Sequence, residues 1–223
     1  MTQIEFHRLV EEIEQAFEKS EIKKHVESAG KNPWYYDICT RIVPQWVLVV
    51  GFNPGVKQNY DHERQNQFPD KTFMESLSDQ GSMCRVGKYL EKYFSQHIKE
   101  IGQTDYCFFR SETAGQIQRS DLQLCLPIFL RLLEIAKPCI ILSFSSRTKK
   151  DLEKSPLLDL TEDRHYKLRR GNLEAEYCSA KGFISVESQK TPIYFLPHPQ
   201  YHISGVYEKE FGGTGLEREN RGT

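Results

Sequence analysis

The order of short apolar runs and helical stretches most strongly constrains the fold. Residues 46–50 form a wholly apolar run, rich in β-branched side chains, that ends at Gly51. A strand without a polar face is typical of a parallel sheet that is covered on both sides. Further strands are expected at residues 106–109, 139–142 and 193–196. Because helical stretches separate these runs, the sequence predicts an α/β fold with a mostly parallel sheet.

Apolar residues recur at helical spacing between these runs. The first helical region covers residues 3 to about 27 and begins with the Thr-x-x-Glu pattern of a capping box. Further helices are expected at residues 85–98 and at residues 122–136, the latter capped by Ser120.

The remaining segments complete one domain. Residues 164–187 alternate around an Arg-Gly-Asn turn, which indicates a hairpin, and the polar residues 57–70 are expected to form a long loop. Because the sequence contains no internal repeat and no linker, we expect a single domain over residues 1–223. It has an N-terminal helical extension at about 1–30 and a flexible tail at about 211–223.

Charge and cysteine content exclude several classes of protein. Thirty basic residues balance thirty-one acidic ones, so a polyanionic partner would need a local basic patch. No apolar run approaches the roughly 20 residues that span a bilayer, and the charged N-terminus is unlike a signal peptide. We therefore expect a cytoplasmic protein without membrane contact. Six cysteines without a C-x-x-C pair favour reduced thiols.

Two segments stand just beyond the carboxyl ends of expected strands, where parallel sheets bind ligands. The first consists of Gly51, Phe52, Asn53, Pro54 and Gly55. Its glycines and proline hold Asn53 in a tight turn, where the amide can orient a water or a polar ring edge. The second begins with His198 and Pro199. The proline restricts His198 to an extended backbone, from which the imidazole can stabilise negative charge on a carbonyl oxygen.

Both segments also have structural interpretations, since N-P-G is an ordinary turn and H-P is common in loops. A functional role is favoured because each segment directly follows an apolar strand. His198 and His202 have the spacing of a helical metal site, but Pro199 interrupts a helix and no third ligand is nearby. We therefore expect no metal.

These residues resemble motifs of the uracil-DNA glycosylase superfamily. Residues 51–55 match the G-x-N-P-G motif of its mismatch-specific and single-strand-selective branches, and residues 198–200 match H-P-S with glutamine in place of serine. Residues 125–142 are similar to the superfamily's C-x-P-x-L…E-I…P-x-I-I segment, and residues 106–110 to the strand before it. The resemblance spans about residues 40–205, in the expected order.

The resemblance implies a three-layer α/β/α sandwich with a central four-stranded, mostly parallel sheet. It implies a pocket that accepts a base flipped out of DNA and hydrolyses its glycosidic bond, with uracil or a related deaminated base as substrate. Asn53 would position the attacking water. His198 would stabilise the anionic base as it leaves, with help from the backbone of Phe52. No cofactor is expected, and no oligomer is required.

Further base contacts follow from the same resemblance. Phe68 is the first candidate to stack on the base, with Met83 as a competitor, and buried packing is an equally good alternative for Phe68. Ser143 stands where several branches read the base, and its hydroxyl can replace the asparagine or glycine found there.

DNA contacts are expected from basic residues beyond the strand ends. The candidates are Arg110, Arg147, Lys149 and Lys150. Residues 164–170 form another basic cluster, and a solvated surface is the alternative for each. Within the second motif, Gln200 occupies the position of the serine that helps to hold a DNA phosphate in the family. Tyr201, with Ile203 as second choice, is expected to wedge into the duplex.

Departures from the family pattern leave a second function open. Cys107 and Cys125 fall near two ligand positions of an iron–sulfur branch, but the N-terminal cysteine pair is absent, so no cluster is expected. The base-reading asparagine and the motif serine are also absent. The alternative is a non-catalytic or repurposed member that binds a free nucleobase or nucleotide. An unrelated phosphate-ester hydrolase would need a carboxylate or metal cluster that the strand ends lack.

Overall fold

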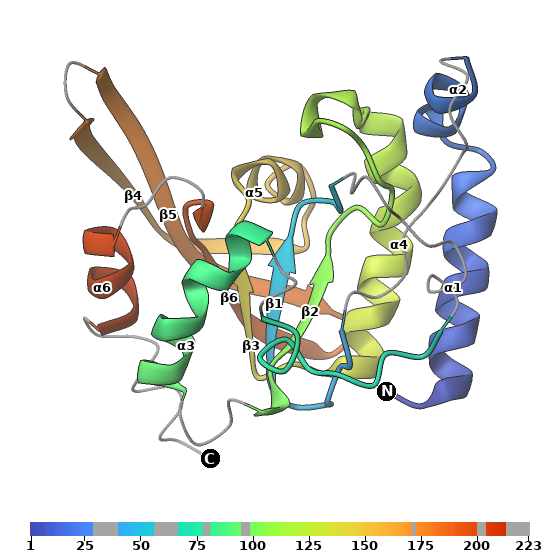
Figure 1. The fold of residues 1–223 in the computed structure, drawn as a ribbon, viewed down its shortest axis with the longest axis horizontal. Coiled ribbons are helices and arrows are strands. Elements are labelled where there is room, and N and C mark those ends of the chain that lie inside the picture. The colour runs from blue at the N-terminus through green and yellow to red at the C-terminus, as the bar shows by residue number, and fades with distance from the viewer. Residues whose placement is uncertain are drawn as a thin grey trace.

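The computed structural model describes residues 1–28, 40–55, 67–77, 81–94, 99–170, 173–199 and 204–212. These residues contain a six-stranded sheet in the order β2-β1-β3-β6-β5-β4 (Figure 1). The strands are β1 (Val47–Gly51), β2 (Gly102–Asp105), β3 (Ile140–Ser143), β4 (Leu158–Arg170), β5 (Leu173–Val186) and β6 (Gln189–Phe195). The α-helices are α1 (Gln3–Phe17), α2 (Glu21–Ser28), α3 (Gly87–Tyr93), α4 (Arg119–Ala136), α5 (Ser146–Leu152) and α6 (Ser204–Gly212). Short 3₁₀ helices are η3 (Gly81–Val86) and η5 (Ala114–Gln116).

The mostly parallel α/β sheet is confirmed, but the expected count of four strands is wrong. Strands β2, β1, β3 and β6 run parallel to one another. The expected hairpin is present as β4 and β5, and β5 pairs antiparallel with β6 from Val186–Gln189 to Ala180–Phe195. The hairpin therefore extends the same sheet by two strands, because β6 leaves one edge able to accept a further strand.

The strand expected at residues 106–109 is also wrong. The strand at this edge of the sheet is β2, which ends directly before residue 106 and pairs with β1. Its Gly-Gln-Thr-Asp sequence carries no apolar side chain. All four residues of β2 are nevertheless buried. Residues 106–109 are buried as well but lie outside the ladder. An apolar run indicates that a segment is buried, but whether it forms a strand depends on the neighbouring strand with which it pairs. Composition alone therefore predicted the wrong residues for this strand.

The helical region expected to end near residue 27 is two helices, α1 and α2. A carboxylate from α4 satisfies the free N–H groups at the start of α2: Asp121 Oδ1 accepts from the Glu21 N–H at 2.8 Å. Asp121 Oδ2 accepts from the Gln118 N–H at 2.8 Å, and Gln118 is the N-cap of α4 in place of the expected Ser120. The capping box of α1 is confirmed. Residues 95–98 of the helix expected at 85–98 lie outside the described part.

Alternate residues of the central strands pack into two apolar cores, one on each face of the sheet. Leu48 and Val50 of β1 join the core formed with α1 and α4. Val47 and Val49 join the core formed with α3 and α6. Figure 1 shows these two pairs of helices on opposite sides of the sheet. This double coverage explains why the run at β1 has no polar face.

Helix α6 was not expected from the sequence. Phe211, placed at the start of a flexible tail, is fully buried, and its ring stacks on Tyr89 and Tyr93 of α3 at centroid distances of 5.9 and 5.7 Å. Glu208 forms an ion pair with Lys92 of α3 at 2.7 Å. Residues 213–223 lie outside the described part. Among the helices that the structure describes, none has the length and apolar character needed to cross a bilayer.

Candidate active site at the carboxyl edge of the sheet

The two motif segments leave the sheet at the same edge. The register places Val50 of β1 beside Ser143 of β3, and Ser143 beside Phe195 of β6. The first motif follows β1 and the second follows β6, so only β3 separates the points at which they leave the sheet. The expected juxtaposition of the two segments at one edge follows directly from the parallel strand direction.

The first motif is held by close contact with the end of β2. The N–H groups of Tyr106 and Cys107 donate to the carbonyls of Gly51 and Phe52 at 3.1 and 2.8 Å. A Cβ atom on Gly51 would lie 2.0 Å from Asp105 Oδ1. Glycine is therefore required here for close approach rather than for a turn.

The amide of Asn53 has one defined orientation. Its Nδ2 donates to the carbonyls of Pro54 and Phe109, each at 3.2 Å, and to Ser111 Oγ at 2.7 Å. Reversing the amide would place Oδ1 against two carbonyl oxygens, so the nitrogen must face them. Within the described residues no group donates to Oδ1. The half-buried Asn53 therefore keeps an acceptor that is fixed in direction and available to a ligand or a water.

His198 is half-buried directly after β6. Burial lowers its pKa below the ordinary value of 6.5, and the nearby Arg85 guanidinium lowers it further. Arg85, from η3, donates through Nη1 to the Pro199 carbonyl at 3.3 Å. Tyr207 of α6 donates to the Pro197 carbonyl. The segment is thus attached both to η3, which is distant in sequence, and to α6, which follows it closely. With its pKa lowered, the imidazole is neutral near pH 7.

Sequence reasoning missed Arg85 altogether. It lies 114 residues from Pro199 in the chain, within a stretch that has no recognisable motif. No local signal in the sequence indicates this contact, because it depends on how η3 packs against the segment after β6.

Removing the Arg85 charge is expected to raise the His198 pKa. Arg85→Gln removes a cation that disfavours the imidazolium, although burial, the larger cause, remains. Since the folded-state pKa is depressed, wild-type stability falls as pH drops below the unfolded value of about 6.5, and this loss is smaller in the variant. NMR titration of the His198 ring protons, assigned with His198→Gln, measures the shift. An unchanged or lower His198 pKa in Arg85→Gln would show that the Arg85 charge does not lower the pKa of this histidine.

Ser143 lies between the two motif strands, at the end of β3. Its side chain is fully buried, and its hydroxyl is without a hydrogen-bond partner among the described residues. An unpaired buried hydroxyl costs about 1–3 kcal/mol. The hydroxyl has no hydrogen bond to break among the described residues, but its oxygen is enclosed, so a ligand contacts it only if neighbouring groups move aside.

The expected stacking residue packs elsewhere. Phe68 meets Phe6 of α1 edge to face, with ring centroids 5.4 Å apart, and packs against the core beneath α1 and α4. In the described part of the chain, no ring contact or hydrogen bond joins Phe68 to either motif. Its competitor Met83 is buried in the opposite core. These contacts favour the packing alternative for Phe68, and a stacking role stays a prediction.

Most of the expected DNA-binding residues are engaged within the chain. Arg110 is only 2% exposed and donates to the Gly55 carbonyl at 2.7 Å. The guanidinium of Arg147 lies 4.5 Å from the centroid of the Phe52 ring and donates to the carbonyls of Ala114 and Ile117. These contacts give both arginines a structural role in holding the first motif.

The two lysines of α5 differ. Lys149 forms ion pairs with Asp163 at 2.6 Å and with Glu153 at 3.1 Å. Lys150 is exposed. Among the four expected phosphate contacts, only Lys150 shows a solvent-facing side chain without a described partner. Gln200, Tyr201, His202 and Ile203 lie outside the described residues.

The cysteines near the family's cluster positions form a buried pair. Cys107 and Cys125 are both fully buried, with their sulfur atoms 3.8 Å apart. Burial, and next the hydrogen bond with Cys125, raise the pKa of Cys107 well above its usual range. In the residues that the structure describes, no three histidine, cysteine or acidic side chains are arranged to hold a metal ion.

Comparison with models of known protein families and with curated proteins finds no match to this chain.

Proposed function

We propose that this protein is a DNA glycosylase of the uracil-DNA glycosylase type. It hydrolyses the N-glycosidic bond of uracil, or of a related deaminated base, in a nucleotide flipped out of DNA. The proposal rests on the fixed amide of Asn53, whose Oδ1 has no donor among the described residues. This acceptor follows β1 at the sheet edge from which the segment carrying His198 also emerges.

In the proposed reaction Asn53 positions the water rather than deprotonating it. An amide oxygen is a very weak base, so the bond from C1′ to the base nitrogen breaks first and its electron pair leaves with the base. Asn53 Oδ1 accepts a hydrogen bond from the water, which adds to the oxocarbenium-like sugar. The water then releases a proton to solvent. Orientation of a reactant in this way contributes several kcal/mol without any acid or base.

The histidine acts on the leaving base. A neutral imidazole donates an N–H to the carbonyl oxygen on which negative charge develops, and this interaction strengthens as the bond breaks. The lowered pKa of His198 supports this role, because the neutral donor then persists through the physiological range. The Ser143 hydroxyl is buried and without a partner among the described residues, so it can bond to the polar edge of the base once neighbouring groups move aside.

The arrangement of the sheet is compatible with the α/β/α sandwich that this activity requires. Four parallel strands in the order β2-β1-β3-β6 correspond to the four-stranded sheet expected from the resemblance. Under this proposal the β4–β5 hairpin is an addition to that four-stranded sheet.

Base release from DNA tests the proposal directly. Labelled single and double strands containing uracil, hypoxanthine or xanthine are incubated with the protein, and abasic sites are cleaved with alkali. We expect a product from at least one substrate. His198→Ala is expected to lower the rate by about 10²- to 10³-fold, the usual effect of losing one charge-stabilising donor. The absence of product from every substrate at stoichiometric enzyme would refute the proposal.

A second candidate is binding of a free nucleobase or nucleotide without catalysis. The engagement of Arg110, Arg147 and Lys149 in intrachain contacts favours it, since these residues leave little of the expected basic rim to DNA. Calorimetric titration with uracil and with uridine monophosphate distinguishes the two candidates. Saturable binding together with no base release would support the second.

A further inference from the structure

The β4–β5 hairpin is longer than the sheet to which it belongs. Pairing between β5 and β6 stops at Ala180 and Phe195. Pairing between β4 and β5 continues for seven further residue pairs, from Arg164–Ser179 to Arg170–Leu173. We call this distal part, residues 164–170 and 173–179, the arm. At about 3.4 Å per residue it reaches roughly 24 Å past the end of β6.

The arm projects from the edge of the sheet that carries the candidate site. Since β6 runs parallel to β3, and β3 to β1, the end of β6 lies at the carboxyl edge. The arm continues past that end, so it leaves the sheet where the segments of Asn53 and His198 begin. Figure 1 shows the hairpin extending past the upper end of the sheet, the end at which α5 also lies.

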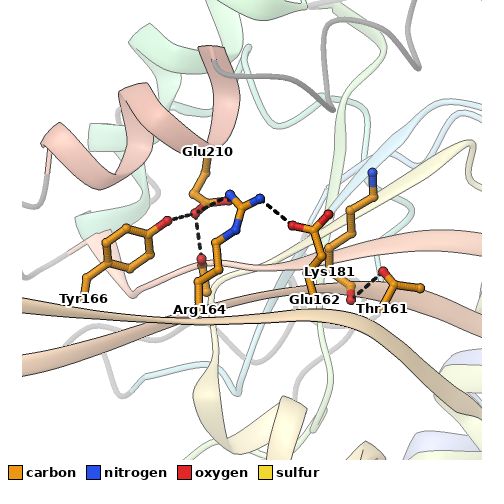
Figure 2. A network of polar contacts seen from close by, with 7 residues as sticks. Thr161, Glu162, Arg164, Tyr166, Lys181 and Glu210 are labelled. Atoms are coloured by element: carbon orange, nitrogen blue, oxygen red, sulfur yellow. Dashed lines mark hydrogen bonds and ion pairs between the residues drawn. The ribbon is translucent and has the colours of Figure 1, made fainter.

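A single carboxylate braces the base of the arm against α6. Glu210 accepts hydrogen bonds from the Tyr166 hydroxyl and from Ser179 Oγ, the latter at 2.7 Å, and lies 3.4 Å from Arg164 Nη1 (Figure 2). Burial, and next the bond to Glu210, raise the Tyr166 pKa, which keeps the phenol protonated as donor. Helix α6 is in turn bonded to the His198 segment through Tyr207. The arm therefore has a defined direction relative to the site.

The arm is basic, although the chain as a whole is not. Its sequence has four basic residues, Arg164, Lys167, Arg169 and Arg170, and two acidic ones, Glu174 and Glu176. The whole chain carries a formal net charge of −1. Arg164 is used in the brace, whereas Lys167 is exposed. A two-stranded ribbon is also one of the elements that the major groove of B-DNA admits.

We propose that the arm binds duplex DNA beside the strand-end site and supplies the phosphate contacts that the engaged residues Arg110, Arg147 and Lys149 do not. The choice of DNA as partner rests on the proposed function. The binding itself does not require catalysis, because an undamaged duplex contains no base to be released.

Charge removal on the arm tests the proposal. The variant Lys167→Gln, Arg169→Gln, Arg170→Gln is compared with a control that loses the same charge at three exposed lysines outside the arm: Lys19→Gln, Lys99→Gln, Lys154→Gln. Fluorescence anisotropy measures binding of a short undamaged duplex between about 50 and 200 mM salt. Each lost phosphate contact lowers the slope of log K against log salt by about 0.9. We expect the arm variant to lose about two to three units of slope and at least tenfold in affinity at the low-salt end.

The outcomes separate this proposal from the proposed function. An arm variant that binds like wild type, or a control that loses as much affinity, would overturn it, as would the lack of any duplex binding by the wild type. Stronger binding to single strands than to duplex would also overturn it. Duplex binding that depends on the arm, in a protein that releases no base, would support the arm while refuting the glycosylase. Equal melting temperatures of the variants exclude misfolding as the cause.

Discussion

Asn53→Ala is expected to lower the rate of base release by at least about 10²-fold, the size of loss that follows when a reactant is no longer held in position. The alanine has no acceptor for the attacking water. Single-turnover rates of wild type and variant on the preferred substrate measure the effect. An undiminished rate would show that the Asn53 amide does not position the water.

Two further variants separate chemistry from structure. Ser111→Ala removes the acceptor of the shortest of the three hydrogen bonds that Nδ2 donates, but it leaves the Asn53 amide in place. We therefore expect a smaller loss of rate, of about tenfold. Asn53→Asp places carboxylate oxygens against the carbonyls of Pro54 and Phe109, and we expect it to lower both rate and stability. A faster reaction in Asn53→Asp would favour a general base over an oriented water.

Phe211→Ala is expected to lower the free energy of unfolding by about 3–5 kcal/mol, which is usual for the truncation of a fully buried phenylalanine. The change removes two stacked contacts to α3 and opens a cavity between α3 and α6. At about 2–4 °C per kcal/mol for a domain of this size, the melting temperature should fall by roughly 6–20 °C.

The control for this variant is Ile4→Ala. Ile4 is a large apolar residue of α1 that is 68% exposed, and its truncation should change stability by no more than about 0.5 kcal/mol. Phe211→Leu keeps most of the buried volume and should recover much of the loss. If Phe211→Ala melts like Ile4→Ala, α6 does not contribute to the core as described.

The prediction of strands succeeded where the chain is apolar on both faces and failed where it is not. The expected runs overlap β1, β3 and the second half of β6, because these parts of the strands are apolar on both faces; the polar first half of β6, with Lys190 exposed, was not expected as strand. β2 was missed because its buried Gln103, Thr104 and Asp105 carry the signature of a loop. Helix α6 was missed because Phe211 stands beside glycines that suggest a frayed end.

The sequence by itself determined that the segments of Asn53 and His198 share one edge of a mostly parallel sheet, because each directly follows an apolar strand and parallel strands end together. Only the tertiary structure decided what surrounds them. It placed Arg85 beside Pro199, turned the Asn53 amide toward the Phe109 carbonyl, and engaged Arg147 and Lys149 within the chain. The positions of strands follow from local patterns of apolar residues. The partner of a polar side chain, by contrast, depends on elements that are far away in sequence, and no periodic pattern in the chain indicates which elements will meet.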